Sequence, residues 1–143
     1  MANRPGTGLI VFAHGSRIGE ANDAVRRVAG QVAERCAVGL WEAAFLELAE
    51  PDLESAVRTL AARGARKILV TPYFLMMGVH LQRDLPRILA AISEQHPGIE
   101  LTASPPLDGH PALIDILADR VGQEIGSWAC WHHGNFACWN LFR

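Results

Sequence analysis

Several features that mark special classes of protein are scarce or missing in this 143-residue sequence. Its 3 cysteines show no framework spacing, which argues against a disulfide-stapled fold and favours reduced thiols in a cytoplasmic protein. Its apolar runs fall far short of the roughly 20 residues of a membrane-spanning helix, and residues 1–6 lack the apolar stretch of a secretory signal. A formal net charge of -2 disfavours nucleic-acid binding, because neutralising phosphates needs a basic surface.

The remaining composition is that of an ordinary globular protein, with 50% hydrophobic and 20% charged residues. We predict one α/β domain over residues 1–126 and a separate tail over residues 127–143. The tail crowds tryptophan, cysteine and histidine together, but its Cys-x-His-His-x4-Cys run matches no standard zinc spacing. A hydrophobic strap, a dimer contact or a departure from related sequences explains it better than a metal site.

Strand-like and helix-like segments alternate along the domain. Short apolar runs predict strands over residues 9–13, 38–46, 68–71 and 99–103. Four helices are predicted between and after these strands. The first has the apolar stripe Ala21, Val25, Val28 and Val32, and the second starts at Pro51-Asp52 and stops at Gly64. The third has its N-cap at Asp84, before Pro86, and ends at His96-Pro97, and the last begins at Pro111. Such alternation predicts a parallel sheet with right-handed crossovers.

The simplest arrangement is a doubly wound, mostly parallel four-stranded sheet of order 2-1-3-4, as in flavodoxin-like folds, with helices flanking it. Ligands in such folds bind beyond the carboxyl ends of the strands, at the switch point between strands one and three. His14 follows the first strand and His80 follows the third, so we expect both imidazoles to meet in one crevice. Imidazole is a common metal ligand and a base near neutral pH.

Glu47 follows the second strand at the same edge of the sheet, where a carboxylate is able to accept protons. An ordinary surface glutamate fits its position equally well.

The segment His14-Gly15-Ser16-Arg17 lies on a predicted strand-to-helix turn. Gly15 permits a tight turn, while Ser16 and Arg17 offer a hydroxyl and a cationic fork that suit a carboxylate or a phosphate. The plainer alternative is that His14 merely ends a strand and that Arg17 is solvated.

The connection from Tyr73 to Arg83 is long for a strand-to-helix link, which is typical of a binding loop. Four large apolar residues follow each other in it: Phe74, Leu75, Met76 and Met77. Such a run indicates a subunit interface or a flat hydrophobic ligand, although we expect two of the four to fold back into the core. The more polar end of the loop contains His80, Gln82, Arg83 and Arg87.

Three ordered motifs together resemble the small sirohydrochlorin chelatases of the CbiX/SirB type. The motifs are His14-Gly15-Ser16-Arg17 with Ala21-Asn22; Phe45-Leu46-Glu47-Leu48-Ala49-Glu50-Pro51; and Pro72-Tyr73-Phe74-Leu75 with Gly78-Val79-His80 and Asp84-Leu85-Pro86. The resemblance runs from about Leu9 to about Val121 and does not cover the tail.

This resemblance implies an enzyme, a lyase, that inserts Co2+ or Fe2+ into sirohydrochlorin on the routes to cobalamin and sirohaem, with no organic cofactor. It implies that His14 and His80 bind the metal and accept protons, with Glu47 assisting. It also implies a homodimer that supplies both halves of the site. Substrate contacts are then expected from Ser16, Arg17, Phe74, Leu75, Met76, Gly78 and Arg83.

Two other functions fit parts of the pattern. A non-catalytic carrier of metal or tetrapyrrole would need the same residues but would show no turnover. A flavodoxin-like phosphoryl module is disfavoured, because the sequence has no glycine-rich phosphate loop and no acidic cluster for magnesium.

Overall fold

The structure is a computed structural model that describes residues 5–132, with side chains described as far as residue 126. It divides into two compact units, Met1–Asp108 and Gly109–Arg143. The predicted boundary between a domain and a tail at residues 126 and 127 stays a prediction, since most of the tail lies outside the described residues.

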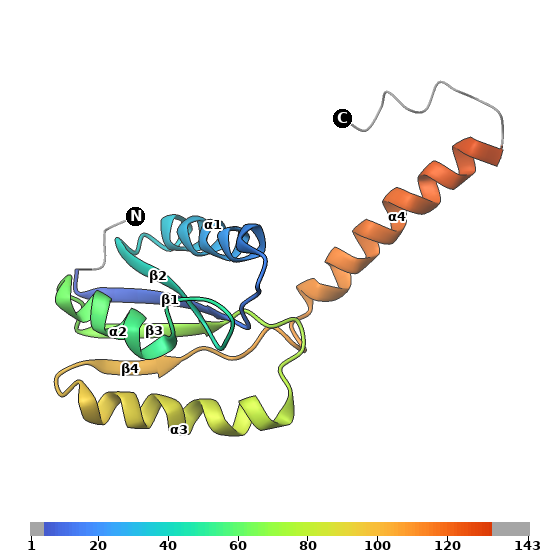
Figure 1. The fold of residues 1–143 in the computed structure, drawn as a ribbon. Helices are drawn as coiled ribbons and strands as arrows, with labels where there is room; N and C mark the ends of the chain where they lie inside the picture. Colours follow the sequence, from blue (N-terminus) through green and yellow to red (C-terminus); the bar gives the residue numbers. More distant parts are fainter. Residues whose placement is uncertain (1–4, 133–143) are drawn as a thin grey trace. The chain divides into compact units, whose positions relative to one another are not determined.

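The first unit is an α/β sandwich around one parallel sheet (Figure 1). Its elements are β1 (Thr7–Ala13), α1 (Gly19–Arg35), β2 (Leu40–Phe45), α2 (Leu53–Ala62), β3 (Lys67–Pro72), α3 (Val79–Gln95) and β4 (Glu100–Ala103). All neighbouring strands pair in parallel and lie in the order β2-β1-β3-β4, which confirms the predicted sheet. The central strand β1 is therefore flanked on both sides, as a fully apolar strand requires.

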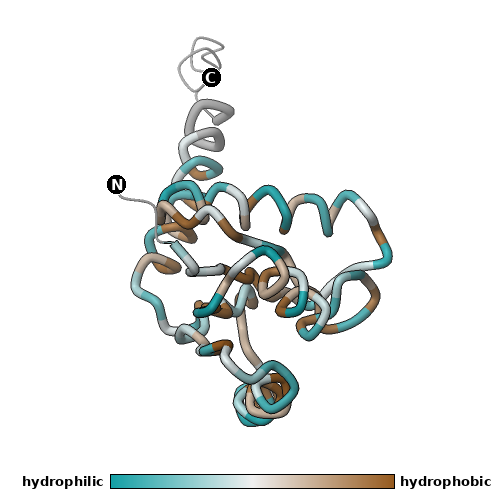
Figure 2. Tube along the Cα trace, turned by 90° about the vertical axis from the view of Figure 1, so that its left-hand side faces the viewer, coloured by the Kyte–Doolittle hydropathy of each residue, from teal (hydrophilic) through white to brown (hydrophobic). Residues whose placement is uncertain are grey.

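Each face of the sheet has its own hydrophobic core. On one face, Ile10 and Phe12 of β1 pack with the apolar sides of α2 and α3. On the other face, Leu9 and Val11 pack with α1 and β2. Along the trace in Figure 2, brown hydrophobic stretches alternate with teal hydrophilic ones, as expected of elements that each bury one side.

The start of α3 differs from the prediction. We expected Asp84 to cap this helix, but α3 begins at Val79 after Gly78, and Asp84 and Pro86 lie inside it. The N–H of Gln82 donates to the Gly78 carbonyl oxygen at 3.1 Å and closes the first turn. The expectation was wrong because apolar residues at helical spacing begin before Asp84: Leu81, Leu85, Leu89 and Ile92 all contact the core.

The buried side of α1 also differs from the predicted stripe. Ala21 is exposed and Val28 is half-buried, whereas Asn22, Ala29 and Ala33 are buried. Val25 and Val32 of the predicted stripe do pack against the core, so the prediction is confirmed for these two, but the buried face extends past them to a polar residue, Asn22. Small residues on that side let α1 approach the sheet closely.

Other predicted boundaries are confirmed. Asp52 caps α2 by accepting the N–H of Ser55 at 2.8 Å, and Gly64 follows the helix with a φ of 100°. His96 is the C-cap of α3 at the opposite edge of the sheet from His14.

The second unit consists, in its described part, of α4 (Ala112–His132) and the turn before it. His110 Nδ1 accepts the N–H of Ala112 at 3.1 Å, so this histidine supports the start of the helix, next to the predicted Pro111. Across residues 5–132, every helix is too short or too polar to traverse a bilayer.

Candidate active site

Three loops emerge from the carboxyl edge of the sheet, where ligands bind in doubly wound folds. They cover residues 14–18 after β1, 46–52 after β2 and 73–78 after β3. In Figure 1 these strands end on the side of the unit where α1 and α3 begin. The predicted site residues lie in these loops, except His80 and Arg83, which lie in the first two turns of α3.

Polar bonds hold the loop after β1. The N–H of Ser16 donates to Asn22 Oδ1 at 3.0 Å, and Asn22 Nδ2 donates back to the Ser16 carbonyl oxygen at 2.8 Å. Ser16 Oγ accepts the N–H of Ile18 at 3.1 Å. Asn22 is only 7% exposed, so both of its bonds are sheltered from water.

The loop after β2 runs alongside the loop after β1. The N–H of Leu46 donates to the Ala13 carbonyl oxygen at 2.9 Å, and the N–H of Glu47 donates to the His14 carbonyl oxygen at 3.0 Å. Gly15 has a φ of 94°, and a Cβ at this position would collide with the carbonyl oxygen of Glu47. The pairing of β1 with β2 thus continues beyond the strands, and it places His14 next to Glu47.

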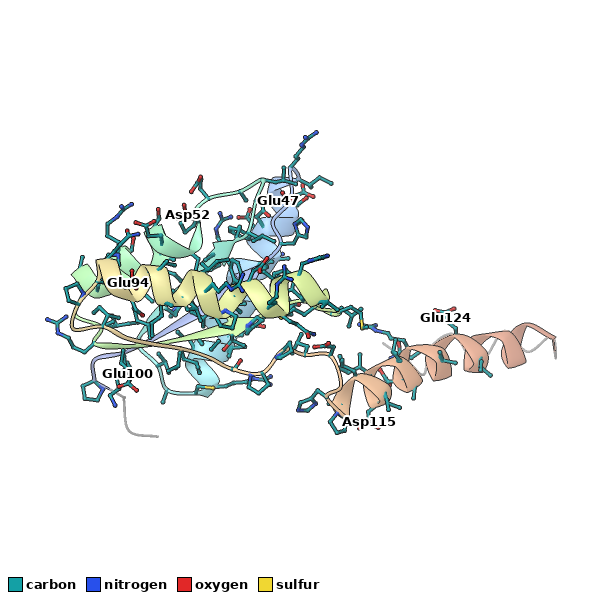
Figure 3. The ribbon with its side chains drawn as sticks, turned by 90° about the horizontal axis from the view of Figure 1, so that it is seen from below. Glu47, Asp52, Glu94, Glu100, Asp115 and Glu124 are labelled. Atoms are coloured by element: carbon teal, nitrogen blue, oxygen red, sulfur yellow. The ribbon has the colours of Figure 1, made fainter. Side chains whose placement is uncertain are left out.

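The side chains of His14 and Glu47 form a solvent-exposed pair. His14 Nε2 lies 3.5 Å from Glu47 Oε1, with the two side chains 59% and 57% exposed. A histidine–carboxylate contact so exposed contributes at most about 0–1 kcal/mol to stability. The pair is therefore accessible for chemistry rather than structural. In Figure 3, Glu47 lies toward the opposite end of the sheet from Glu94 and Glu100.

His80 lies at the same edge but on a different element. It is exposed in the first turn of α3 rather than in a long loop, because that helix begins earlier than predicted. Within the described residues, no three histidine, cysteine, aspartate or glutamate side chains are grouped to hold a metal ion. The structure brings His14 to Glu47, and the meeting of His14 with His80 stays a prediction.

The apolar run after β3 divides into two pairs. Phe74 packs edge-on against Phe12 with ring centroids 5.7 Å apart, and Met77 is buried in the same core. Leu75 and Met76 are 66% and 78% exposed. Two of the four residues thus fold back, as expected, and two remain on the surface.

Further apolar side chains surround the edge and were not singled out from the sequence. Ile18, Leu46, Leu48 and Tyr73 lie in the three loops, Val79 begins α3, and each of these five residues is at least 41% exposed. Their signal in the sequence is weak, since single apolar residues at a surface are common. Only the fold shows that they share one edge with His14, which makes the edge an apolar rim around a polar pair.

The predicted polar contacts are placed as follows. Arg17, Gly78 and Arg87 are exposed, and Arg83 Nε contacts Asp84 Oδ1 at 3.2 Å. Ser16 uses its Oγ oxygen to accept from Ile18, which leaves the hydroxyl proton available to a ligand.

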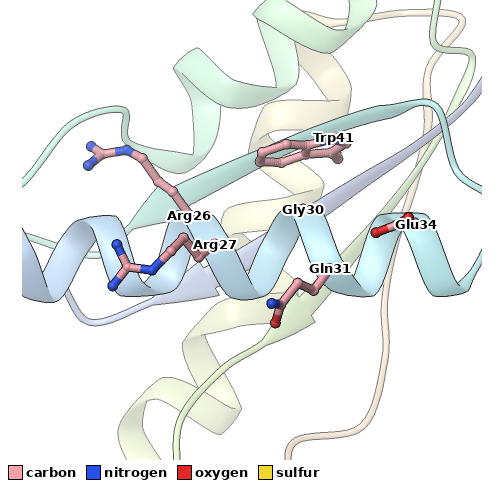
Figure 4. A pocket seen from close by; sticks show the side chains of 6 residues that line it. All are labelled: Arg26, Arg27, Gly30, Gln31, Glu34 and Trp41. Carbon is pink, nitrogen blue, oxygen red and sulfur yellow. The ribbon is translucent and has the colours of Figure 1, made fainter.

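A shallow groove lies elsewhere on the unit, between α1 and the outer strand β2. Figure 4 shows Trp41 beside Gly30 of α1, with Arg26 and Arg27 further along the helix. None of the predicted site residues lines this groove. We therefore place the candidate active site at the carboxyl edge.

Comparison with known proteins identifies the family. The CbiX family model matches residues 8–124, a span that includes all three loops. The chain belongs to the CbiX family.

Individual relatives differ in length. The sirohydrochlorin cobaltochelatase of Methanocaldococcus jannaschii is 35% identical over 137 residues, covering 79% of this CbiX chain and 96% of that protein. The chloroplastic sirohydrochlorin ferrochelatase of Arabidopsis thaliana is 32% identical over 114 residues, covering 80% of this chain. The match spans only 51% of the Arabidopsis protein, so the CbiX chain corresponds to about half of its length.

A solved structure agrees with the fold. The crystal structure of the CbiX protein from Marinobacter aquaeolei VT8 superposes with a TM-score of 0.72 at 27% sequence identity. The match covers 85% of this chain and 98% of that chain.

Proposed function

We propose that this CbiX family chain inserts a divalent metal, Co2+ or Fe2+, into sirohydrochlorin. The observation that carries the proposal is the exposed His14–Glu47 pair, 3.5 Å apart at the carboxyl edge of the sheet. The relatives named as a cobaltochelatase and a ferrochelatase support this reaction, and their names favour catalysis over a non-catalytic carrier.

The reaction sets three tasks for the site. A hydrated metal ion must lose water, two pyrrole N–H protons must leave, and the macrocycle must present its nitrogens to the metal. We assign the metal, as a substrate, to the imidazoles of His14 and His80, which are able to bind it while leaving positions open for pyrrole nitrogens. Glu47 beside His14 is suited to accept one of the two protons released by the ring, and an imidazole that has passed its metal to the ring is suited to accept the other.

The apolar rim offers a surface for a flat ring. Leu75 and Met76 are exposed next to the site, and adaptable methionine side chains suit such a contact. The ring's carboxylates would be met by Arg17 and Arg83, with help from the Ser16 hydroxyl. No organic cofactor is needed for this assignment.

A single chain of this size offers one side of an enclosed tetrapyrrole site. We therefore propose a homodimer in which a second copy contributes the other side, across Leu75 and Met76. Sedimentation at decreasing protein concentration tests this: a monomer that keeps full activity would contradict the dimer. The cytoplasmic location and the reduced cysteines also belong to this proposal.

The test of function is optical. Protein is mixed with sirohydrochlorin and Co2+, and the metallation spectrum is followed against a protein-free control. We expect His14→Ala and His80→Ala each to slow the reaction by about 100-fold or more, and Glu47→Gln by a smaller factor, because general acid–base groups contribute on this scale. Arg66→Ala at the far edge is the control and should leave the rate unchanged. Absence of acceleration by the wild-type protein would overturn the proposed function.

A further inference from the structure

The first turns of α1 contact both loops that carry the candidate catalytic pair. Asn22 contacts the loop after β1 through the two bonds to Ser16, one to its N–H and one from Nδ2 to its carbonyl oxygen. A side-chain amide that pairs with both backbone groups of one residue fixes its peptide planes as a neighbouring strand would. Asn22 is the one buried polar side chain among the described residues, and burying it is favourable only because both its groups are bonded.

Arg26 lies one helical turn further along the same side of α1 and contacts the other loop. Its Nη2 donates to the Glu50 carbonyl oxygen at 2.9 Å, and its guanidinium carbon lies 5.2 Å from the centre of the Phe45 ring. Asp23 orients it through an ion pair to Nη1 of 2.8 Å. A planar guanidinium stacked on a ring and bonded to a carbonyl is a geometry that lysine does not reproduce.

The side chains of the candidate catalytic pair, His14 and Glu47, are only weakly held by their own contacts. His14 and Glu47 are both more than half exposed, and the contact between them is 3.5 Å long. Their relative position therefore depends on the two backbones beneath them, which the bond from Glu47 N–H to the His14 carbonyl oxygen joins directly. Contacts that hold these two backbones in place therefore also hold the His14 and Glu47 side chains in their relative position.

We propose that Asn22 and Arg26 are positioning residues that clamp the His14 and Glu47 loops to one helix and so keep the exposed pair in reacting geometry. The inference deepens the proposed function and rests on it. It predicts that both residues affect the reaction without touching substrate or metal. Because small displacements of reacting groups strongly reduce the rate of a reaction, loss of either contact is expected to slow metal insertion by about 10- to 100-fold.

Four variants at the two positions test the clamp. Asn22→Ala removes both bonds to Ser16, whereas Asn22→Asp keeps the acceptor for the Ser16 N–H and loses the donor. Arg26→Ala removes the bond to Glu50, and Arg26→Lys keeps the charge without the planar stack. We expect Asn22→Asp to slow insertion at least as much as Asn22→Ala, because a carboxylate oxygen would face the Ser16 carbonyl oxygen, and Arg26→Lys to resemble Arg26→Ala.

Two controls separate positioning from general effects. Arg27→Ala removes an exposed arginine next to Arg26 on the same helix and should leave the insertion rate unchanged. Val57→Ala destabilises the same unit from a fully buried site on α2 that makes no hydrogen bond to either loop through its side chain. It should lower the free energy of unfolding without slowing insertion at a temperature where the protein stays folded.

Amide hydrogen exchange measured by NMR supplies a readout that does not depend on activity. In Asn22→Ala we expect the N–H groups of Ser16 and Glu47 to exchange at least about tenfold faster, while the Val70 N–H in β3 changes little. In Arg26→Ala only Glu47 should respond. In Val57→Ala, exchange through global unfolding should rise for all three.

The outcomes are distinct. Slower insertion together with faster local exchange in the Asn22 and Arg26 variants supports the clamp. Insertion rates equal to that of Arg27→Ala, or unchanged exchange at Glu47 in both alanine variants, would overturn it. If the wild-type protein inserts no metal, the proposed function fails, and the exchange pattern together with a Co2+ titration of each variant still decides whether the residues position the pair.

Discussion

The two histidines at the carboxyl edge are held in different ways. His14 lies in a loop fixed by hydrogen bonds, from Ser16 to Asn22 and from Glu47 to the His14 carbonyl oxygen. His80 lies in the first turn of a helix whose approach is anchored by apolar packing, with Phe74 against Phe12 and Met77 in the core.

The difference matters because hydrogen bonds and apolar packing respond differently to substitution of a side chain. A buried polar bond depends on two groups at one distance and angle, so one atom changed leaves a partner unsatisfied. A packed side chain tolerates another of similar volume and shape. We therefore expect the His14 side of the site to be sensitive to small chemical changes, and the His80 side to be sensitive mainly to loss of volume.

The largest effect is expected from Gly15→Ala. The added Cβ would collide with the carbonyl oxygen of Glu47 at a residue whose φ is 94°, and we expect the free energy of unfolding to fall by about 3 kcal/mol. Urea denaturation measures it. Gly64→Ala is the matched control, because Gly64 has a φ of 100° with nothing within 4 Å of a Cβ. That variant should lose about 1 kcal/mol, from backbone strain alone. Equal losses in the two variants would contradict the close approach of the two loops.

Truncation at Phe74 tests the other half of the comparison. Phe74→Ala removes the ring that packs on Phe12 and should cost about 2 kcal/mol of stability, whereas Phe74→Leu should cost less than about 1.5 kcal/mol. Leu75→Ala, at a neighbouring side chain that is 66% exposed in the single chain, should change the stability little at protein concentrations too low for the proposed dimer. Thermal or urea unfolding of the three variants measures the order, and a loss in Phe74→Leu as large as in Phe74→Ala would show that apolar volume alone does not anchor this approach.

A third kind of contact, a helix cap, holds the end of the loop after β2, where Asp52 caps α2. Its bond from the Ser55 N–H lowers the pKa of the Asp52 carboxyl below its ordinary value of 3.8. A lowered pKa in the folded state stabilises the protein above the ordinary value, and this contribution is lost as pH falls through the folded value. Asp52→Ala should cost about 1 kcal/mol at neutral pH.

Asp52→Asn is its control, since asparagine keeps the cap but carries no titrating charge. Urea unfolding of the three proteins from pH 7 to pH 3 should show that only the wild-type protein loses the Asp52 contribution at acid pH. Parallel losses in wild type and Asp52→Asn would contradict the assignment of the lowered pKa to this bond.

The smallest effect is expected at Leu48, next to Glu47. This residue has a φ of 63°, which costs a leucine about 1–2 kcal/mol and a glycine almost nothing. Leu48→Gly should leave the free energy of unfolding within about 0.5 kcal/mol of wild type, because the relieved strain offsets the added chain entropy. Leu46→Gly, at an exposed position two residues earlier, should instead be destabilising by about 1 kcal/mol. A Leu48→Gly variant that loses as much as Leu46→Gly would show that the loop is not strained.

Particular elements show which features of the fold were predicted correctly from the sequence and which were not. The strand order followed from the alternation of strands and helices, and the edge that carries His14 and Glu47 followed from the strand order. The start of α3 was misplaced because a capping aspartate and a proline at Asp84 and Pro86 are local signals, whereas the packing of Leu81 and Leu85 is not. The inner face of α1 was predicted only in part, through Val25 and Val32, because apolar periodicity does not reveal a buried asparagine.

The sequence by itself determined the family, the topology and the edge of the sheet that carries the candidate active site, because these depend on local periodicity and on the order of elements along the chain. Only the tertiary structure decided which side chains meet there. His14 contacts Glu47, and Asn22 and Arg26 hold the loops of both, through bonds between residues that lie on different elements. Such contacts depend on how elements pack in three dimensions, and no spacing within a single element encodes them.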